Sequence, residues 1–145
     1  MTIARLKRPE SVLVVVHTPD LHCLMLERVE PRGFWQSVTG SLRWDEAAAD
    51  AAAREIREET GLEAAGLIDA REERRFQIAP EWRHRYAADV KENLEHWFYL
   101  ELPGVCDITL NTTEHCRHEW LELEAAIERA SSWTNREALE KLRSA

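Results

Sequence analysis

The segment that most constrains the fold runs from Glu46 to Thr60 and is dense in alanine and glutamate. Both residue types favour the α-helix. Asp45 can cap its beginning, and Gly61 can end it in a left-handed turn. The face expected to point inward carries small side chains, namely Ala49, Ala52, Ala53 and Ile56. Such a face lets a helix lie close against a β-sheet, so we expect an α/β domain.

Strand patterns on both sides of this helix supply the sheet. A valine-rich strand is expected at residues 11–18, its hairpin partner at 21–29, and a short strand at 34–39 that Gly40 breaks. Further strands are expected at 71–78, 96–102 and 118–121, helices at 121–130 and 135–143, and a long polar loop at 80–94. Strands interspersed with helices, including a hairpin, predict a mixed sheet covered by helices on both faces.

Length and charge limit the possible classes of function. The 145 residues predict one domain, 1–145, and the net charge of −8 would repel nucleic acid and anionic membranes. The N-terminal residues lack the apolar core of a signal peptide, and the longest aliphatic run, 12–16, is too short to span a bilayer. The odd number of cysteines argues against a disulfide framework. We expect a cytoplasmic protein with a small-molecule ligand, whose oligomeric state the sequence leaves open.

Three glutamates share one face of the expected helix. At about 100° per residue, Glu55, Glu58 and Glu59 fall within an arc of roughly 100°. Carboxylates this close repel one another, and a divalent cation that prefers oxygen ligands, Mg²⁺ or Mn²⁺, would remove the conflict. Arg54 lies one helical turn before Glu58 and can hold its carboxylate. A solvated acidic helix face is the alternative, yet a position directly after a strand and a glycine favours a pocket.

The stretch from Gly40 to Leu62, GSLRWDEAAADAAAREIREETGL, resembles the Nudix box of a family of hydrolases. The resemblance implies an α/β/α sandwich with a mixed β-sheet, and cleavage of a phosphoanhydride bond in a nucleoside diphosphate linked to another group. Many Nudix boxes have a glycine where Trp44 and Asp45 stand, so the shape of this loop is an open point of the resemblance. The resemblance also implies that Glu55, Glu58 and Glu59 bind metal and that Gly40, Glu46, Arg54 and Gly61 shape the box.

Blocks outside the box resemble one branch of this family, the dihydroneopterin triphosphate diphosphatases. The blocks are LKRPESVLVVV, FWQSVTGSL, WRHRYAADVKENLEHWF, TEHCRHEWLEL and SSWTNREALEKL. This similarity implies Mg²⁺-dependent hydrolysis of 7,8-dihydroneopterin triphosphate to the monophosphate and pyrophosphate, a step of folate biosynthesis, with side activity on dATP. It adds Glu114 to the metal-binding and catalytic glutamates. The substrate contacts that it implies are Lys7, Arg28, Thr39, Phe76, Gln77, Ile78, Ala79 and Ser132.

Some of these assignments have a second interpretation. Lys7 and Arg28 suit phosphate binding, but they could equally be solvated charges beside strands. Glu114 begins the run EHCRH, for which a zinc site is an alternative. Trp133 is a candidate to stack on a flat ring. Two other functions also stay open, namely a pyrophosphohydrolase that removes dATP or damaged nucleotides, and a Nudix-like module that binds a nucleotide without cleaving it.

Overall fold

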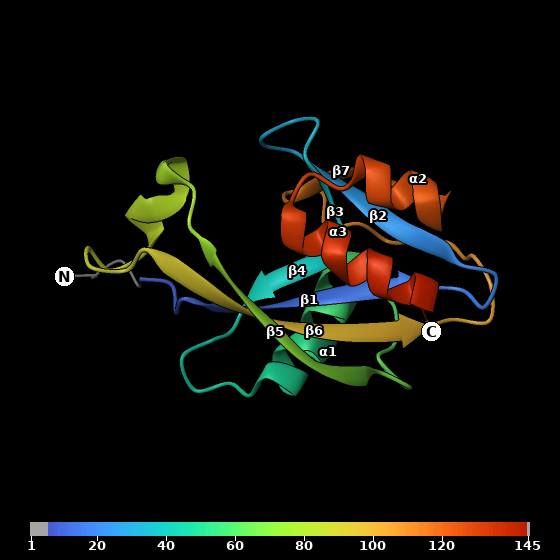
Figure 1. Cartoon of the computed structure of the whole chain (residues 1–145), viewed down its shortest axis with the longest axis horizontal. Coiled ribbons are helices and arrows are strands. Elements are labelled where there is room, and N and C mark those ends of the chain that lie inside the picture. Colours follow the sequence, from blue (N-terminus) through green and yellow to red (C-terminus); the bar gives the residue numbers. More distant parts are fainter. Residues whose placement is uncertain (1–5, 145) are drawn as a thin grey trace.

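A computed structural model describes residues 6–144 as a mixed β-sheet with helices on both faces (Figure 1). This arrangement confirms the predicted α/β/α sandwich. Among the described residues, no helix is both long and apolar enough to cross a membrane. The strands are β1 (Glu10–His17), β2 (His22–Arg28), β3 (Trp35–Gln36), β4 (Val38–Ser41), β5 (Ile68–Gln77), β6 (Glu92–Glu101) and β7 (His115–Glu122). The helices are α1 (Ala48–Thr60), α2 (Leu123–Arg129) and α3 (Trp133–Glu140), with 3₁₀ segments η1 (Pro80–Arg85) and η2 (Lys141–Ser144).

Strand β1 lies at the centre of the sheet. The strand order is β3-β2-β1-β6-β5, with β4 beside β1 and β7 beside β2. Strand β1 pairs in parallel with β6 and antiparallel with β2 and β4. Its side chains alternate between two cores: Val12 and Val14 pack with α1, whereas Leu13 and Val15 pack with α2 and α3. The apolar run in β1 is continuous because helices cover both of its faces.

Helix α1 starts later than the sequence predicts and ends where predicted. It begins at Ala48, and its N-cap residue is Ala47, which makes no side-chain capping bond. The prediction that Asp45 caps the helix is therefore wrong. At the other end Gly61 has a φ of 73°, and its N–H donates to the Arg57 carbonyl oxygen. The predicted left-handed C-cap is confirmed.

The buried face of α1 is turned relative to the prediction. Ile56 is buried as expected, but Ala49 is exposed and Ala51 is buried in its place. The same face carries Glu55 and Glu59, which are also buried. The helix therefore presents two carboxylates to the protein interior rather than an entirely apolar stripe.

Gly40 does not break its strand, contrary to the prediction. Strand β4 continues through this residue, and Gly40 pairs with Val12 of β1. The interruption lies at Ser37, between β3 and β4. A glycine stands at position 40 because the Glu55 side chain occupies the space that a Cβ would fill.

The segment predicted as a long loop, 80–94, is partly regular. It contains η1, and its last residues belong to β6. The Arg85 carbonyl oxygen at the end of η1 accepts the Lys7 N–H at 2.8 Å. The end of η1 therefore lies beside Lys7.

Hydrogen bonds join the β3–β4 segment to the beginning of α3. The Ser37 N–H donates to Asn135 Oδ1 at 2.7 Å, and Asn135 Nδ2 donates to Ser37 Oγ at 2.9 Å. The Trp35 N–H donates to Ser131 Oγ at 2.9 Å, and the Ser131 N–H donates to the Trp35 carbonyl oxygen. These contacts fix the beginning of α3 against β3 and β4. They give a physical reason for the distinctive FWQSVTG and SSWTN blocks.

Candidate active site

One cavity of about 610 Å³ gathers the residues predicted to bind metal and substrate. They come from segments far apart in the sequence, including the N-terminal segment, β2, β4, α1 and β5. The predicted metal-binding glutamates that border it are Glu55, Glu58, Glu59 and Glu114. The predicted substrate contacts that border it are Lys7, Arg28, Thr39, Phe76, Gln77, Ile78, Ala79 and Ser132.

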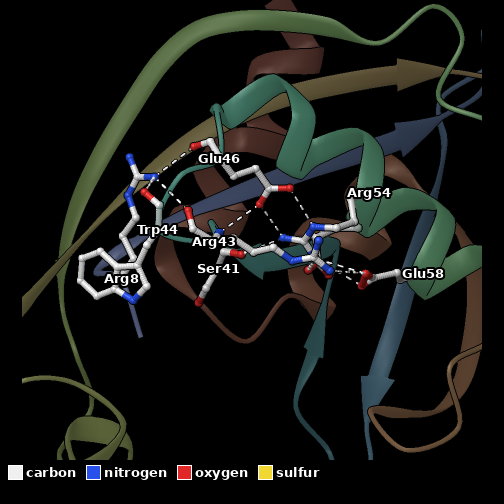
Figure 2. Close-up of polar contacts among 8 residues, drawn as sticks. Arg8, Ser41, Arg43, Trp44, Glu46, Arg54 and Glu58 are labelled. Carbon is white, nitrogen blue, oxygen red and sulfur yellow. Dashed lines mark hydrogen bonds and ion pairs between the residues drawn. The ribbon is translucent and has the colours of Figure 1, made fainter. Parts of the chain in front are cut away.

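Arg54 joins the carboxylates of α1 to the preceding loop (Figure 2). Its Nε and Nη2 donate to the two carboxylate oxygens of Glu46, each at 2.8 Å. Its Nη1 donates to Glu55 at 2.7 Å and to Glu58 at 3.2 Å, and Nη2 also donates to the Ser41 carbonyl oxygen. The hydrogen bonds from Arg54 lower the pKa of Glu46 to about 2. Arg54 thus holds both the loop and the carboxylates, as the Nudix resemblance implies.

Arg8, which the sequence analysis did not single out, shapes the loop before α1 (Figure 2). Its Nη1 donates to the carbonyl oxygens of Arg43, Trp44 and Glu46, each at 3.0 Å. The Glu46 carboxylate accepts the Arg43 N–H from the other side at 3.0 Å. These bonds hold the loop at the place where many Nudix boxes have a glycine. They also order the chain just before a helix that lacks a side-chain cap.

Gly40 lets Glu55 lie directly on the backbone of β4. A Cβ at position 40 would be 2.1 Å from Glu55 Cδ and 2.4 Å from Glu55 Oε1. Those distances are far below an ordinary van der Waals contact. The missing side chain of Gly40 therefore fixes where the Glu55 carboxylate can lie.

A buried histidine holds Glu59. His115 Nδ1 lies 3.0 Å from Glu59 Oε2, and His115 Nε2 lies 3.1 Å from the side-chain nitrogen of Gln36. Since an amide nitrogen only donates, Nε2 accepts and the proton resides on Nδ1, which donates to Glu59. The neighbouring Cys116 thiol instead contacts the Glu27 carbonyl oxygen. His115 and Cys116 therefore point to different partners, which disfavours the zinc alternative.

The carboxylate oxygens of the cavity suit Mg²⁺ or Mn²⁺, both of which prefer hard oxygen ligands. Within residues 6–144, no three His, Cys, Asp or Glu side chains already converge as a metal cluster. Existing contacts explain this, because Arg54 forms ion pairs with Glu55 and Glu58, while His115 forms a hydrogen bond with Glu59. The donor set fits a divalent ion, which would take over carboxylate oxygens now paired with Arg54.

Burial makes the Glu55 carboxyl a weaker acid than usual. It is only 8% exposed, and this burial raises the pKa of Glu55 to about 7. Arg54 opposes the rise, and the negative charges of Glu58 and Glu59 add to it. A nearby cation would favour the ionised carboxylate, so this wall of the cavity attracts positive charge.

Cations and aromatic rings form other parts of the cavity wall. Burial, together with the positive charges of Arg85 and Arg28, lowers the pKa of Lys7. The Arg28 guanidinium lies 5.5 Å from the centroid of the Trp82 ring. Trp133, the candidate for ring stacking, borders the cavity and is 45% exposed. A polyphosphate and a flat ring can both find complementary groups here.

Polar residues of β6 that were not predicted also border the cavity. Asn93 and Glu95 alternate along the strand and are 2% and 5% exposed. Trp97, the next residue on that face, is fully buried. The sequence does carry a signal for them, since polar residues at alternate positions before an apolar one indicate a strand face that leaves the core and enters a pocket.

Comparisons with known proteins identify the family of the chain. The NUDIX domain family matches residues 7–142. Dihydroneopterin triphosphate diphosphatase of Escherichia coli (strain K12) is 43% identical, over 93% of this chain and 92% of that protein. The enzyme of that name from Haemophilus influenzae is 37% identical, over 93% and 87%. The solved structure of the E. coli dihydroneopterin triphosphate pyrophosphohydrolase superposes with a TM-score of 0.87 at 42% identity, and covers 94% of this chain and 95% of that one. The chain therefore belongs to the NUDIX domain family.

Proposed function

We propose that this Nudix hydrolase converts 7,8-dihydroneopterin triphosphate to the monophosphate and pyrophosphate, a cytoplasmic step of folate biosynthesis. The observation that carries the proposal is the 43% identity to an enzyme of that name over almost the whole chain. Segments outside the Nudix box contribute to the same cavity as the box, among them Lys7, Phe76 and Ser132. The substrate would therefore contact residues from the blocks that resemble the diphosphatase branch as well as residues of the Nudix box. We expect dATP to be a side substrate.

The glutamates of the cavity would hold the metal ion. Glu55, Glu59 and Glu114 are the proposed ligands, with Glu58 beside them, for Mg²⁺ or alternatively Mn²⁺. When bound, such an ion neutralises phosphate charge and helps to orient an attacking water. Arg54 and His115 would hold Glu58 and Glu59 in position, respectively.

Cationic and aromatic groups would position the organic part of the substrate and its phosphates. Lys7 and Arg28 can each meet a phosphate oxygen, and their mutual repulsion falls when an anion lies between them. Trp133 offers an exposed ring face to the bicyclic ring. These residues would fix the triphosphate relative to the acidic wall, so that the reacting phosphorus is correctly placed.

A substrate panel tests the proposal. Purified protein with Mg²⁺ is given 7,8-dihydroneopterin triphosphate, dATP, a dinucleoside polyphosphate and ADP-ribose, and the products are separated by chromatography. We expect the largest kcat/KM for the pterin compound, with pyrophosphate released in equal amount to the monophosphate. The proposal fails if the pterin compound is cleaved no faster than the other substrates.

Glu59→Gln separates a catalyst from a nucleotide-binding module. The amide keeps the size of the side chain but removes its charge, so kcat should fall by at least about 100-fold while the fold is retained. Glu63→Gln is the matched control, because Glu63 is exposed just beyond α1. Equal rates in Glu59→Gln and the control would contradict the assigned role of Glu59.

A further inference from the structure

A buried carboxyl group borders the cavity on β6, on a different element from the glutamates of α1. Glu95 is 5% exposed. Among the described residues, no Lys, Arg or His side chain lies within ion-pair distance of it, although the positive charge of Arg74 nearby favours its ionised form. A buried carboxyl without a cationic partner is costly unless hydrogen-bond donors compensate. Glu95 is therefore a candidate to accept further hydrogen bonds from a ligand in the cavity.

The protein satisfies only part of the hydrogen-bonding capacity of Glu95. Burial raises the pKa of Glu95, and hydrogen bonds from the Trp97 indole and the Thr134 hydroxyl, together with the charge of Arg74, offset this only in part. Trp97 Nε1 donates to Glu95 Oε1 at 3.0 Å. A carboxylate accepts about four hydrogen bonds, so roughly two acceptor positions are left. Further N–H donors would favour the ionised form.

Asn93 adds a second unmet acceptor to the same strand face. Its Nδ2 donates to Ser11 Oγ at 2.8 Å. Within residues 6–144, Asn93 Oδ1 is the buried side-chain polar atom that has no hydrogen-bond partner. Asn93 and Glu95 are two residues apart on a strand, so both side chains project to one side of the sheet. Both border the cavity.

The strand register places this pair apart from the Nudix box. Ser11 of β1 pairs with Ser41 of β4 on one side and with Glu95 of β6 on the other. Glu95 is therefore separated by two strand spacings, a distance of about 10 Å, from β4, the strand that contacts Glu55. The linker between the phosphates and the ring of a nucleotide-like molecule can bridge such a distance. The phosphates could therefore lie at the Nudix box while the ring reaches β6.

We propose that Glu95, assisted by Asn93, recognises a ring edge with two adjacent N–H donors, as in a 2-amino-4-oxopyrimidine. Such an edge presents a ring N–H beside an exocyclic amino group, and a carboxylate accepts both. The adenine edge presents a donor beside an acceptor, and so repels one carboxylate oxygen. That the ring is a dihydropterin rests on the proposed function. The preference for a double-donor edge rests on Glu95 and Asn93.

Glu95→Gln tests this preference by replacing one acceptor oxygen with a donor. kcat/KM is measured for 7,8-dihydroneopterin triphosphate, for dGTP, which has the same double-donor edge, and for dATP. We expect a 10- to 100-fold loss, on the order expected for a charged hydrogen bond, for the two double-donor substrates. The rate with dATP should stay equal or rise, because a carboxamide matches the adenine edge. Glu101→Gln, an exposed position on the same strand, is the matched control and should not change the ratios.

The readout is a ratio between substrates on one enzyme preparation, so a smaller folded fraction in the variant cancels. An equal loss for all three substrates, or unchanged ratios, overturns the assignment of Glu95. Failure of the proposed function would look different, because the wild-type enzyme would then not favour the pterin compound. In that case the ratio of dGTP to dATP hydrolysis still decides whether Glu95 reads the ring edge.

Discussion

Substitution of Gly40 by alanine should separate the stability of the fold from the geometry of the site. The new Cβ would lie 2.1 Å from Glu55 Cδ. An ordinary carbon–carbon contact is about 3.5 Å, so the carboxyl group must retreat by about 1.4 Å. The clashing atoms are the end of a flexible side chain, so we expect a loss of only about 1–3 kcal/mol in the free energy of unfolding. A misplacement of about 1 Å in a catalytic group can cost about 100-fold in rate, so kcat/KM should fall by at least that factor.

The assay compares Gly40→Ala with wild type in calorimetric unfolding, in Mn²⁺ binding by titration calorimetry, and in hydrolysis of the pterin triphosphate. Gly104→Ala is the matched control, since a Cβ there meets nothing within 4 Å. The control should retain wild-type activity and metal affinity. A Gly40→Ala protein that binds Mn²⁺ and turns over like wild type would refute the argument that Gly40 positions Glu55.

The remaining predictions concern the groups that hold the carboxylates. Arg54→Lys keeps the charge but loses the paired hydrogen bonds to the two carboxylate oxygens of Glu46. Calorimetry should therefore show a loss of about 1–3 kcal/mol in the free energy of unfolding, and unchanged stability would contradict this. His115→Leu removes the donor to Glu59 and should weaken Mn²⁺ binding by about 10- to 100-fold, which titration calorimetry would detect or exclude. Burial raises the pKa of Glu55 from 4.5 to about 7. In the metal-free protein, the contribution of this carboxyl group to the free energy of unfolding should therefore be fully present below pH 4.5 and be lost as pH rises through about 7. Denaturant unfolding between pH 5 and 8 should show the loss in wild type and not in Glu55→Gln.

The sequence predicted the elements whose signals are local. The run from Val12 to Val16 is continuously apolar because β1 is buried on both faces, and that composition alone identifies the strand. The left-handed cap at Gly61 likewise needs only one residue type at one position. The spacing of the glutamates also placed them on one helix face. These features require no knowledge of distant segments.

Features that depend on contacts distant in the sequence could not be predicted this way. Asp45 has the right side chain for a cap, but the loop is fixed by Arg8, which lies more than thirty residues earlier and bonds three of its carbonyl oxygens. Gly40 suggested a strand break because the side chain that requires a glycine there, Glu55, lies on another element and leaves no local signal. The bond between His115 and Glu59 joins residues 56 positions apart. In the first two cases tertiary contacts overrode a local preference, and in the third no local signal existed.

The charges of the cavity show how an acidic protein can bind a polyphosphate. Glu55, Glu58 and Glu59 would repel phosphate groups, and Arg54 and Arg43 offset only part of their charge. Lys7, lying near Arg28, has a lowered pKa and so gains from an anion nearby. A divalent ion on the acidic wall reverses its sign and turns repulsion of the substrate into attraction. Because each ligand improves the electrostatic environment of the other, metal and triphosphate should raise each other's affinity by the same factor.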